Sequence, residues 1–125
     1  MGNLEVIARI KIRPGELEGF KTQAAELRRL TREKDTKTLR YDWYIDEKAM
    51  ECEVHEDYVN EEGMYEHNAH VKDARAVLFE KYAFDHQMSF FGDISEKLVA
   101  LTKHHAEAAH VYRFVGGIDG VARTS

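Results

Sequence analysis

The sequence predicts an α+β protein of the ferredoxin-like type, in which an antiparallel sheet carries the two helices of a split βαβ unit on one face. Strand-like alternation and helical spacing follow one another as β-α-β-β-α-β, and one more α-β unit follows. Hydrophobic residues make up 43% of the 125 residues, enough for one core, and the single cysteine, Cys52, cannot form an internal disulfide. We expect a single domain over residues 1–125, with residues 93–125 as a C-terminal α-β extension.

The first strand and the first helix have the clearest patterns. Over residues 4–12 every second side chain is apolar, which is typical of a strand with one buried face. Pro14 and Gly15 end this strand, and Pro14 suits the first turn of a helix, where its missing N–H costs nothing. The helix is predicted to reach about Lys34, because apolar residues recur at three- and four-residue steps. These positions are Leu17, Phe20, Ala24, Leu27 and Thr31.

A β-hairpin is predicted next. In residues 38–46 the alternation places Tyr41 and Trp43 on one face and Tyr44 on the other, and residues 50–58 alternate in the same way. The link between these strands is short and polar, as hairpin links are. Because aromatic side chains lie on both faces of residues 38–46, we expect the open face of the sheet to pair with a second copy, giving a homodimer.

The remaining elements follow from caps and spacing. Asn60 is a candidate cap for a short helix over residues 61–67, and a longer helical pattern follows it. Residues 84–91 form the predicted fourth strand. Asp93 then starts a last helix with a capping box, and residues 110–115 form a last short strand. The apolar positions of the two helical patterns are Val71, Ala74, Val77 or Leu78, and Tyr82 in the first, and Ile94, Leu98, Leu101 and His105 in the second.

Composition excludes several classes of partner. The formal net charge is -5 and the basic residues are scattered, so no nucleic-acid partner is expected. No apolar run approaches the ~20 residues of a membrane span, and the N-terminus lacks the basic and apolar regions of a signal peptide. We therefore expect no membrane contact and a cytoplasmic location.

Three segments resemble the antibiotic biosynthesis monooxygenase domain family: residues 6–15, residues 39–44, and the Glu-Asp-Tyr of residues 56–58 with His67 further along. Residues 91–112 are similar to a C-terminal extension of some members. The resemblance implies a dimeric α/β barrel with a pocket between the sheet and the helices. It also implies oxidation of aromatic polyketides or quinols by O₂ without metal or flavin, while relatives degrade haem or isomerise small signalling molecules.

His67 is the candidate catalytic base, because imidazole is the side chain best suited to take a proton near neutral pH. A phenol or quinol that loses its proton becomes an electron-rich anion that can pass an electron to O₂. By alternation, Glu56 lies on the apolar face of its strand, so its carboxylate needs a partner. That partner is either His67, which Glu56 would then orient, or one of two arginines, Arg9 and Arg40.

Aromatic side chains are the candidates for binding a flat substrate. Trp43, Tyr41, Tyr58 and Phe90 could line a pocket, or could serve only core and dimer-interface packing. Arg40 could hold an oxyanion, or could donate to a surface ion pair. Tyr58 stands where haem-degrading relatives carry Trp, which argues against haem chemistry.

His70 lies one helical turn after His67, a spacing at which two imidazoles can share a metal. No third ligand is marked, so we expect no metal site and no other cofactor, and His70 is counted with the substrate-binding residues. The first hypothesis is a cofactor-independent monooxygenase or related oxidoreductase acting on a small aromatic or quinone-like molecule. The alternatives are a non-catalytic binding or stress-response protein with the same pocket, and an isomerase of a small carbonyl compound that uses His67 as its base.

Overall fold

The computed structural model of the protein describes residues 3–119. Its elements follow one another as β1 (Leu4–Ile12), α1 (Leu17–Lys34), β2 (Thr38–Asp46), β3 (Glu51–Tyr58), α2 (Glu61–Lys81), β4 (Ala83–Phe91), α3 (Glu96–Thr102) and β5 (Ala108–Tyr112). The predicted order of elements is confirmed, and with it the α+β, ferredoxin-like fold class.

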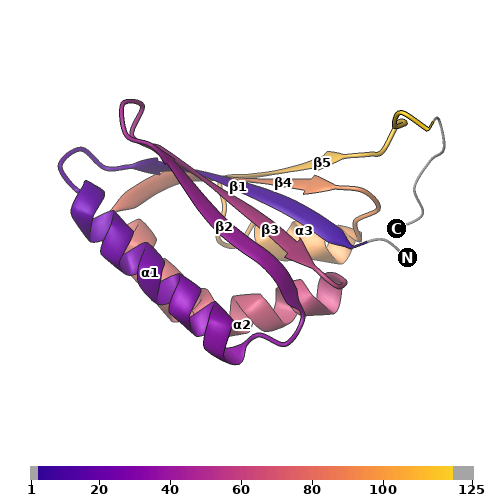
Figure 1. Cartoon of the computed structure of the whole chain (residues 1–125), viewed down its shortest axis with the longest axis horizontal. Helices are drawn as coiled ribbons and strands as arrows, with labels where there is room; N and C mark the ends of the chain where they lie inside the picture. The colour runs from indigo at the N-terminus through magenta and orange to yellow at the C-terminus, as the bar shows by residue number, and fades with distance from the viewer. Residues whose placement is uncertain (1–2, 120–125) are drawn as a thin grey trace.

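The strands form one five-stranded sheet in the order β2-β3-β1-β4-β5. Neighbouring strands are antiparallel, except that β4 and β5 pair in parallel through a connection that contains α3. Helices α1 and α2 pack on each other over one face of the sheet, as Figure 1 shows. The last strand, predicted over residues 110–115, begins earlier, at Ala108, and extends the sheet beyond β4. The C-terminal extension is therefore part of the sheet.

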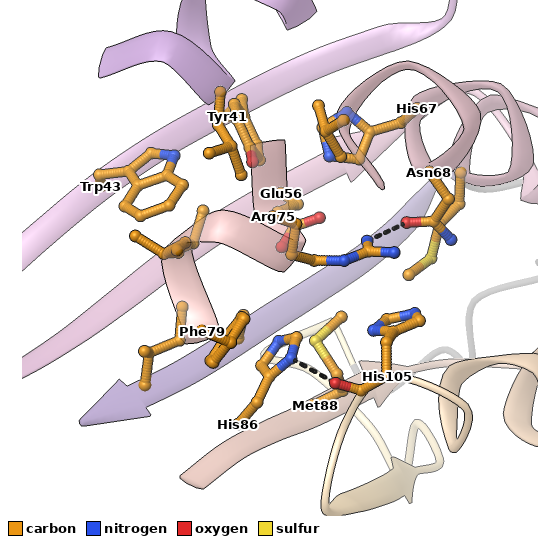
Figure 2. A pocket seen from close by; sticks show the side chains of 17 residues that line it. Tyr41, Trp43, Glu56, His67, Asn68, Arg75, Phe79, His86, Met88 and His105 are labelled. Carbon is orange, nitrogen blue, oxygen red and sulfur yellow. Dashed lines mark hydrogen bonds between the residues drawn. The ribbon is translucent and has the colours of Figure 1, made fainter. Parts of the chain in front are cut away.

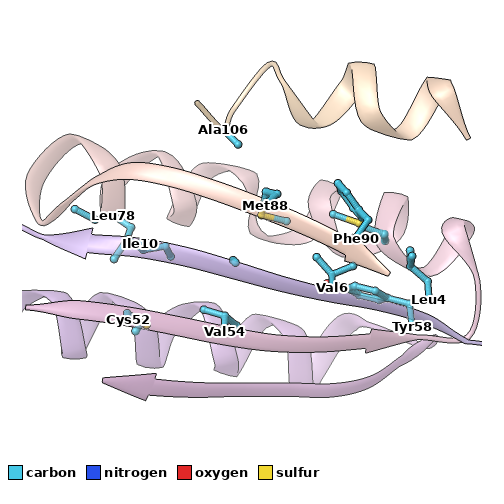
Figure 3. Close-up of a cluster of buried hydrophobic side chains, with 14 of the residues drawn as sticks. Leu4, Val6, Ile10, Cys52, Val54, Tyr58, Leu78, Met88, Phe90 and Ala106 are labelled. Carbon is cyan, nitrogen blue, oxygen red and sulfur yellow. The ribbon is translucent and has the colours of Figure 1, made fainter. Parts of the chain in front are cut away.

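The hydrophobic core lies between this face of the sheet and the two helices. On β1, Val6, Ala8 and Ile10 are at most 3% exposed, whereas the alternating Glu5 and Arg9 are exposed. Figure 3 shows how such inward-facing side chains from β1, β3 and β4 meet in one layer. Burial of this layer is the main favourable contribution to folding, and the alternation gives β1, β3 and β4 a defined inner face.

Helix α2 begins after Asn60 as predicted but is longer than the predicted short helix, and only the start of α3 differs from the prediction. The short and the longer helical patterns form one continuous helix, α2, whose cap Asn60 accepts a side-chain hydrogen bond from the backbone N–H of Gly63. Helix α3 starts after Ser95 rather than at Asp93, and the Ser95 hydroxyl accepts from the N–H of Leu98. Asp and Ser are almost equally good caps, so local propensity does not choose between two neighbouring candidates.

A β-bulge in β4 decides which of its side chains face the helices. The register of β4 against β1 shifts between Phe84 and Gln87. Asp85, inside this shift, has φ 53°, in the left-handed region. The extra residue at the bulge leaves His86 buried on the same face as Met88.

The opposite face of the sheet is mostly polar. Arg9 forms ion pairs there with Glu51 and Glu53, and apolar side chains such as Ile7 and Tyr44 lie among the charges. The expected split of aromatic residues between the two faces of β2 is present, with Tyr44 50% exposed. Among the described residues no helix is both long and apolar enough to cross a membrane.

Candidate active site

A cavity lies in the layer between the sheet and α2 (Figure 2). The centre of a water-sized molecule can occupy about 30 Å³ of it, and all the space between its lining atoms, the open mouth included, is about 390 Å³. Side chains from α1, from strands β1 to β4, from α2 and from the segment after α3 line it. Besides the aromatic Tyr41 and Trp43, the polar side chains of the lining are Glu56, His67, Asn68, Arg75, His86 and His105.

His67 reaches the cavity from α2 and is only 3% exposed. Its Nδ1 atom lies 2.8 Å from Oδ2 of Asp35. An ionised carboxylate can only accept a hydrogen bond, so Nδ1–H donates and Nε2 keeps the ring's lone pair. Nε2 is therefore the nitrogen that can take a proton from a molecule in the cavity.

Asp35 follows the last residue of α1, and its side chain is 1% exposed. It accepts hydrogen bonds from His67, from His70 at 2.6 Å and from the Thr38 hydroxyl at 2.7 Å. Burial acts to raise the pKa of Asp35, but these hydrogen bonds outweigh it, so the pKa lies below its usual value. Asp35 is thus a buried, charged group that orients the His67 ring.

Glu56 is buried on the inner face of β3, as the alternation predicts. Glu56 forms no hydrogen bond with His67 or with either arginine. Nδ1 of His67 instead donates to Asp35, and the carboxylate of Glu56 accepts a hydrogen bond from the Tyr58 hydroxyl at 2.5 Å. Burial raises the pKa of Glu56, while the nearby His67, the Tyr58 hydrogen bond and the Arg75 guanidinium partly oppose this. The prediction that Glu56 orients His67 is wrong in this geometry.

The two arginines considered as partners of Glu56 lie on the other face of the sheet. Arg40 Nε is 2.7 Å from Asp42, and Arg9 Nη2 is 2.7 Å from Glu53. Arg40 therefore forms a surface ion pair, the second of its two predicted roles, and it is not part of the cavity lining.

The predicted aromatic residues separate into two groups. Tyr41 and Trp43 line the cavity, and the Tyr41 ring packs edge-on against His67 with a centroid distance of 4.6 Å. Tyr58 and Phe90 are fully buried in the core and are not among the lining residues. Tyr58 and Phe90 therefore serve core packing, which was the alternative to lining the pocket.

Arg75 projects from α2 into the cavity. Within residues 3–119 it has no carboxylate partner in an ion pair, and its hydrogen bond is from Nη1 to the Asn68 side-chain oxygen at 2.9 Å. Burial lowers the pKa of Arg75, opposed by Tyr41 and Glu56, yet a guanidinium stays charged at all ordinary pH values. A positive charge without a direct ion pair, although close enough to Glu56 to interact with it, therefore borders the cavity, where it suits an anionic oxygen.

Two histidines form the other side of the cavity. His86 stacks on Phe79 with a centroid distance of 4.6 Å and donates from Nδ1 to the backbone carbonyl of His105 at 3.2 Å. Burial lowers the pKa of His86 to about 4, although that hydrogen bond opposes it. Burial, together with the charge of Arg75, lowers the pKa of His105 to about 3. Both imidazoles are therefore neutral at neutral pH.

Unpartnered buried polar atoms concentrate at this cavity. Four buried side-chain nitrogens lack a hydrogen-bond partner in the described part of the chain: Trp43 Nε1, His105 Nδ1 and Nε2, and Arg13 Nε. Three of the four belong to residues of the cavity lining. Since buried polar groups in folded proteins are nearly always paired, these atoms indicate a place where an ordered water or a ligand supplies the partner.

Sequence reasoning missed Asp35, Arg75, Asn68, His86 and the role of His105. Signals for two of them existed. Asp35 stands at the C-terminal end of a helix, where a negative charge interacts unfavourably with the helix dipole and so suggests another role. Arg75 lies four residues after Val71 and three before Leu78, in the middle of an apolar stripe.

No three side chains of His, Cys, Asp or Glu converge as a metal site within residues 3–119. His67 and His70 both turn their Nδ1 atoms to Asp35. Cys52 is buried in the core, and burial raises the pKa of its thiol to about 12, which leaves it unreactive.

Comparison with solved structures supports the fold. MupZ from Pseudomonas fluorescens is 18% identical, with a TM-score of 0.76 over 98% of this chain and 100% of MupZ. Rv0793 from Mycobacterium tuberculosis is 22% identical, with a TM-score of 0.64 over 76% of this chain and 98% of its own. A structure described as an antibiotic biosynthesis monooxygenase is 21% identical, with a TM-score of 0.64 over 74% of this chain and 99% of its own.

No family model matches the chain, and no curated protein matches it in sequence. Identities at this level establish a common fold. The ferredoxin-like α+β fold is therefore confirmed, the dimeric barrel that the sequence resemblance implied stays a prediction, and activity has to be argued from the site.

Proposed function

We propose that this protein is an enzyme of the antibiotic biosynthesis monooxygenase type, which ionises a small aromatic or quinol substrate and lets the anion react with O₂. The observation that carries the proposal is the meeting of two groups in one cavity. His67, oriented by Asp35, can take a proton, and Arg75, which forms no direct ion pair with a carboxylate of the described residues, can stabilise the oxyanion that remains. The shared fold of a structure with that description supports the assignment.

The chain's own residues account for the first step. Asp35 holds Nδ1–H of His67, so Nε2 accepts the substrate's hydroxyl proton and the carboxylate stabilises the imidazolium that forms. A fixed guanidinium in a water-poor site stabilises a developing oxyanion more strongly than water does. Tyr41 and Trp43 supply an aromatic wall for a flat ring.

The reaction balances without an external reductant. A quinol gives two electrons and two protons to O₂, and the products are a quinone and hydrogen peroxide. A hydroxyaromatic with an activated CH₂ group becomes a ketone: one oxygen atom of O₂ enters the product and the other leaves as water with the two hydrogens. In both cases the anion passes the first electron to O₂.

Isomerisation of a small carbonyl compound is the second candidate. It would use the same proton abstraction by His67. The observation that favours it is the pair of neutral imidazoles, His86 and His105, because the N–H of a neutral imidazole can polarise the substrate carbonyl while His67 returns the proton at another atom.

An oxygen electrode separates these functions. A panel of quinols, hydroxynaphthalenes and small enols is tested with and without a chelator, with His67→Ala as the paired variant. O₂ uptake that needs His67 and survives chelation supports the proposal. Product formed equally well without O₂ points to an isomerase, and binding without turnover across the panel points to a non-catalytic binder.

A further inference from the structure

We infer that the substrate carries two oxygen functions and is held at both: an ionisable hydroxyl between His67 and Arg75, and a second, neutral hydroxyl or carbonyl at His105. The inference rests on the proposed function and names the substrate class of that same cavity, a molecule of quinol shape. It assigns His105 as a substrate-binding residue supplied by the C-terminal extension.

The placement of the three groups supports a ligand held at two ends. Figure 2 draws His67 and His105 on either side of the Arg75 guanidinium. All three line the same cavity, and Arg75 is close enough to His105 to disfavour its protonation. A flat molecule that contacts Arg75 with one of its oxygens can therefore contact His105 with a second oxygen in the same cavity.

The backbone segment that carries His105 is held firmly in place. The segment that carries it is tied to β4 by three hydrogen bonds with His86: His86 Nδ1 to the His105 carbonyl at 3.2 Å, His86 N to the Glu107 carboxylate at 2.7 Å, and Glu107 N to the His86 carbonyl at 2.8 Å. The intervening Ala106 is 8% exposed. These hydrogen bonds fix the backbone that carries the ring, so His105 stays in the cavity lining while both of its ring nitrogens remain without a partner.

The unmet hydrogen-bonding capacity of His105 defines what it would bind. Both of its ring nitrogens are buried and unpartnered, and a neutral imidazole offers one donor and one acceptor. A hydroxyl or carbonyl of a ligand satisfies such a nitrogen without adding charge. A charged carboxylate of the ligand at His105 would lack a cation to pair with, because Arg75 is the one arginine or lysine among the lining residues and already contacts the first oxygen.

The test compares hydroquinone, with two opposed hydroxyls, and phenol, with one, as NMR titrations of ¹⁵N-labelled protein under nitrogen. Trp43 is the only tryptophan of the chain and lines the cavity, so its single indole N–H signal reports occupancy. We expect hydroquinone to bind about tenfold more tightly than phenol, the size of one hydrogen bond to an otherwise unpaired buried group. We also expect hydroquinone alone to shift the ring ¹⁵N resonances of His105.

Variants assign the preference to one residue. His105→Phe keeps an aromatic ring without nitrogen and should bind both probes equally, while His105→Asn, which keeps a donor and an acceptor, should recover part of the preference. His104→Phe is the matched control in the same turn, because His104 is exposed, and it should behave as the unaltered protein does. Arg75→Gln should weaken both probes.

Each other outcome overturns the inference. Equal binding of the two probes to the unaltered protein, or a preference that survives in His105→Phe, removes His105 from ligand binding. If Arg75→Gln still weakens both probes in that case, the proposed function stands and only the two-ended substrate is wrong. If neither probe binds at millimolar concentration, the quinol substrate class itself is wrong.

Discussion

The Nδ1 atom of His67 lies 2.8 Å from a carboxylate oxygen of Asp35, a residue 32 positions earlier in the chain. The other oxygen of Asp35 accepts from His70 at 2.6 Å. One buried carboxylate at the end of α1 thus holds two imidazoles of α2, and it fixes the tautomer that leaves Nε2 of His67 free to accept a proton.

His67→Ala should lower turnover of the accepted substrate by ~10²–10⁴-fold, the usual contribution of a positioned proton acceptor. Steady-state O₂ uptake with the best substrate of the panel measures this. His55→Ala is the control, since His55 lies on the outer face of the sheet away from the cavity. Full turnover in His67→Ala would remove His67 from the mechanism.

Asp35→Asn should lower turnover by roughly tenfold or more, because a neutral amide stabilises the imidazolium less and can favour the other tautomer. The pH profile of turnover should move as well, which a purely structural role of Asp35 would not cause. Asp42→Asn, at an exposed carboxylate paired with Arg40, serves as the control. An unchanged pH profile in Asp35→Asn would argue that the His67 ring does not need its charge.

Glu56→Gln should change the free energy of unfolding by about 1 kcal/mol or less, because a Gln oxygen can still accept from the Tyr58 hydroxyl and no arginine loses a partner. Urea denaturation monitored by Trp43 fluorescence measures the change. A loss of several kcal/mol would show that Glu56 is the charged partner of a buried cation, and Arg75 is the arginine whose charge acts on it.

Stability should fall on acidification below about pH 6.5. The pKa values of His86 and His105 are lowered in the folded protein, to about 4 and about 3. Between these values and 6.5 the unfolded chain binds more protons than the folded one, so unfolding becomes more favourable as the pH falls. For His86 the loss is on the order of 3 kcal/mol by pH 4. Urea midpoints from pH 7 to pH 4 measure it, and His86→Phe should flatten the slope. An equally steep slope in that variant would show that other groups cause it.

The protein should be a dimer at micromolar concentration, paired through the outer face of the sheet. Ile7, at the centre of β1 on that face, is only partly covered within one chain. Ile7→Arg should therefore yield monomers with an unchanged circular dichroism spectrum, because its side chain does not contribute to the core. Light scattering measures the mass. A monomer mass for the unaltered protein would disprove the pairing.

Local patterning by itself determined the sheet and the two large helices. Two-residue alternation on β1, β2 and β3 places one apolar face inward, and a one-residue slip would expose every core side chain, so the strand assignments leave little freedom. The same alternation correctly placed Glu56 on the inner face and Tyr41 beside Trp43. The first residue of α3 was less certain, because Asp93 and Ser95 are equally good helix caps by local propensity.

Only the tertiary structure decided the partners in the cavity. The pairing of Asp35 with His67 joins the end of one helix to the side of another, a contact that no local spacing encodes. His86 faces the helices because of a bulge at Asp85, and His105 reaches the cavity because β5 pairs in parallel with β4. Hydrogen bonds and ion pairs depend on distances of a few ångströms between segments far apart in the chain. Hydrophobic alternation specifies only which face of an element is buried, and so it predicts the framework but not the partner that each polar group finds within it.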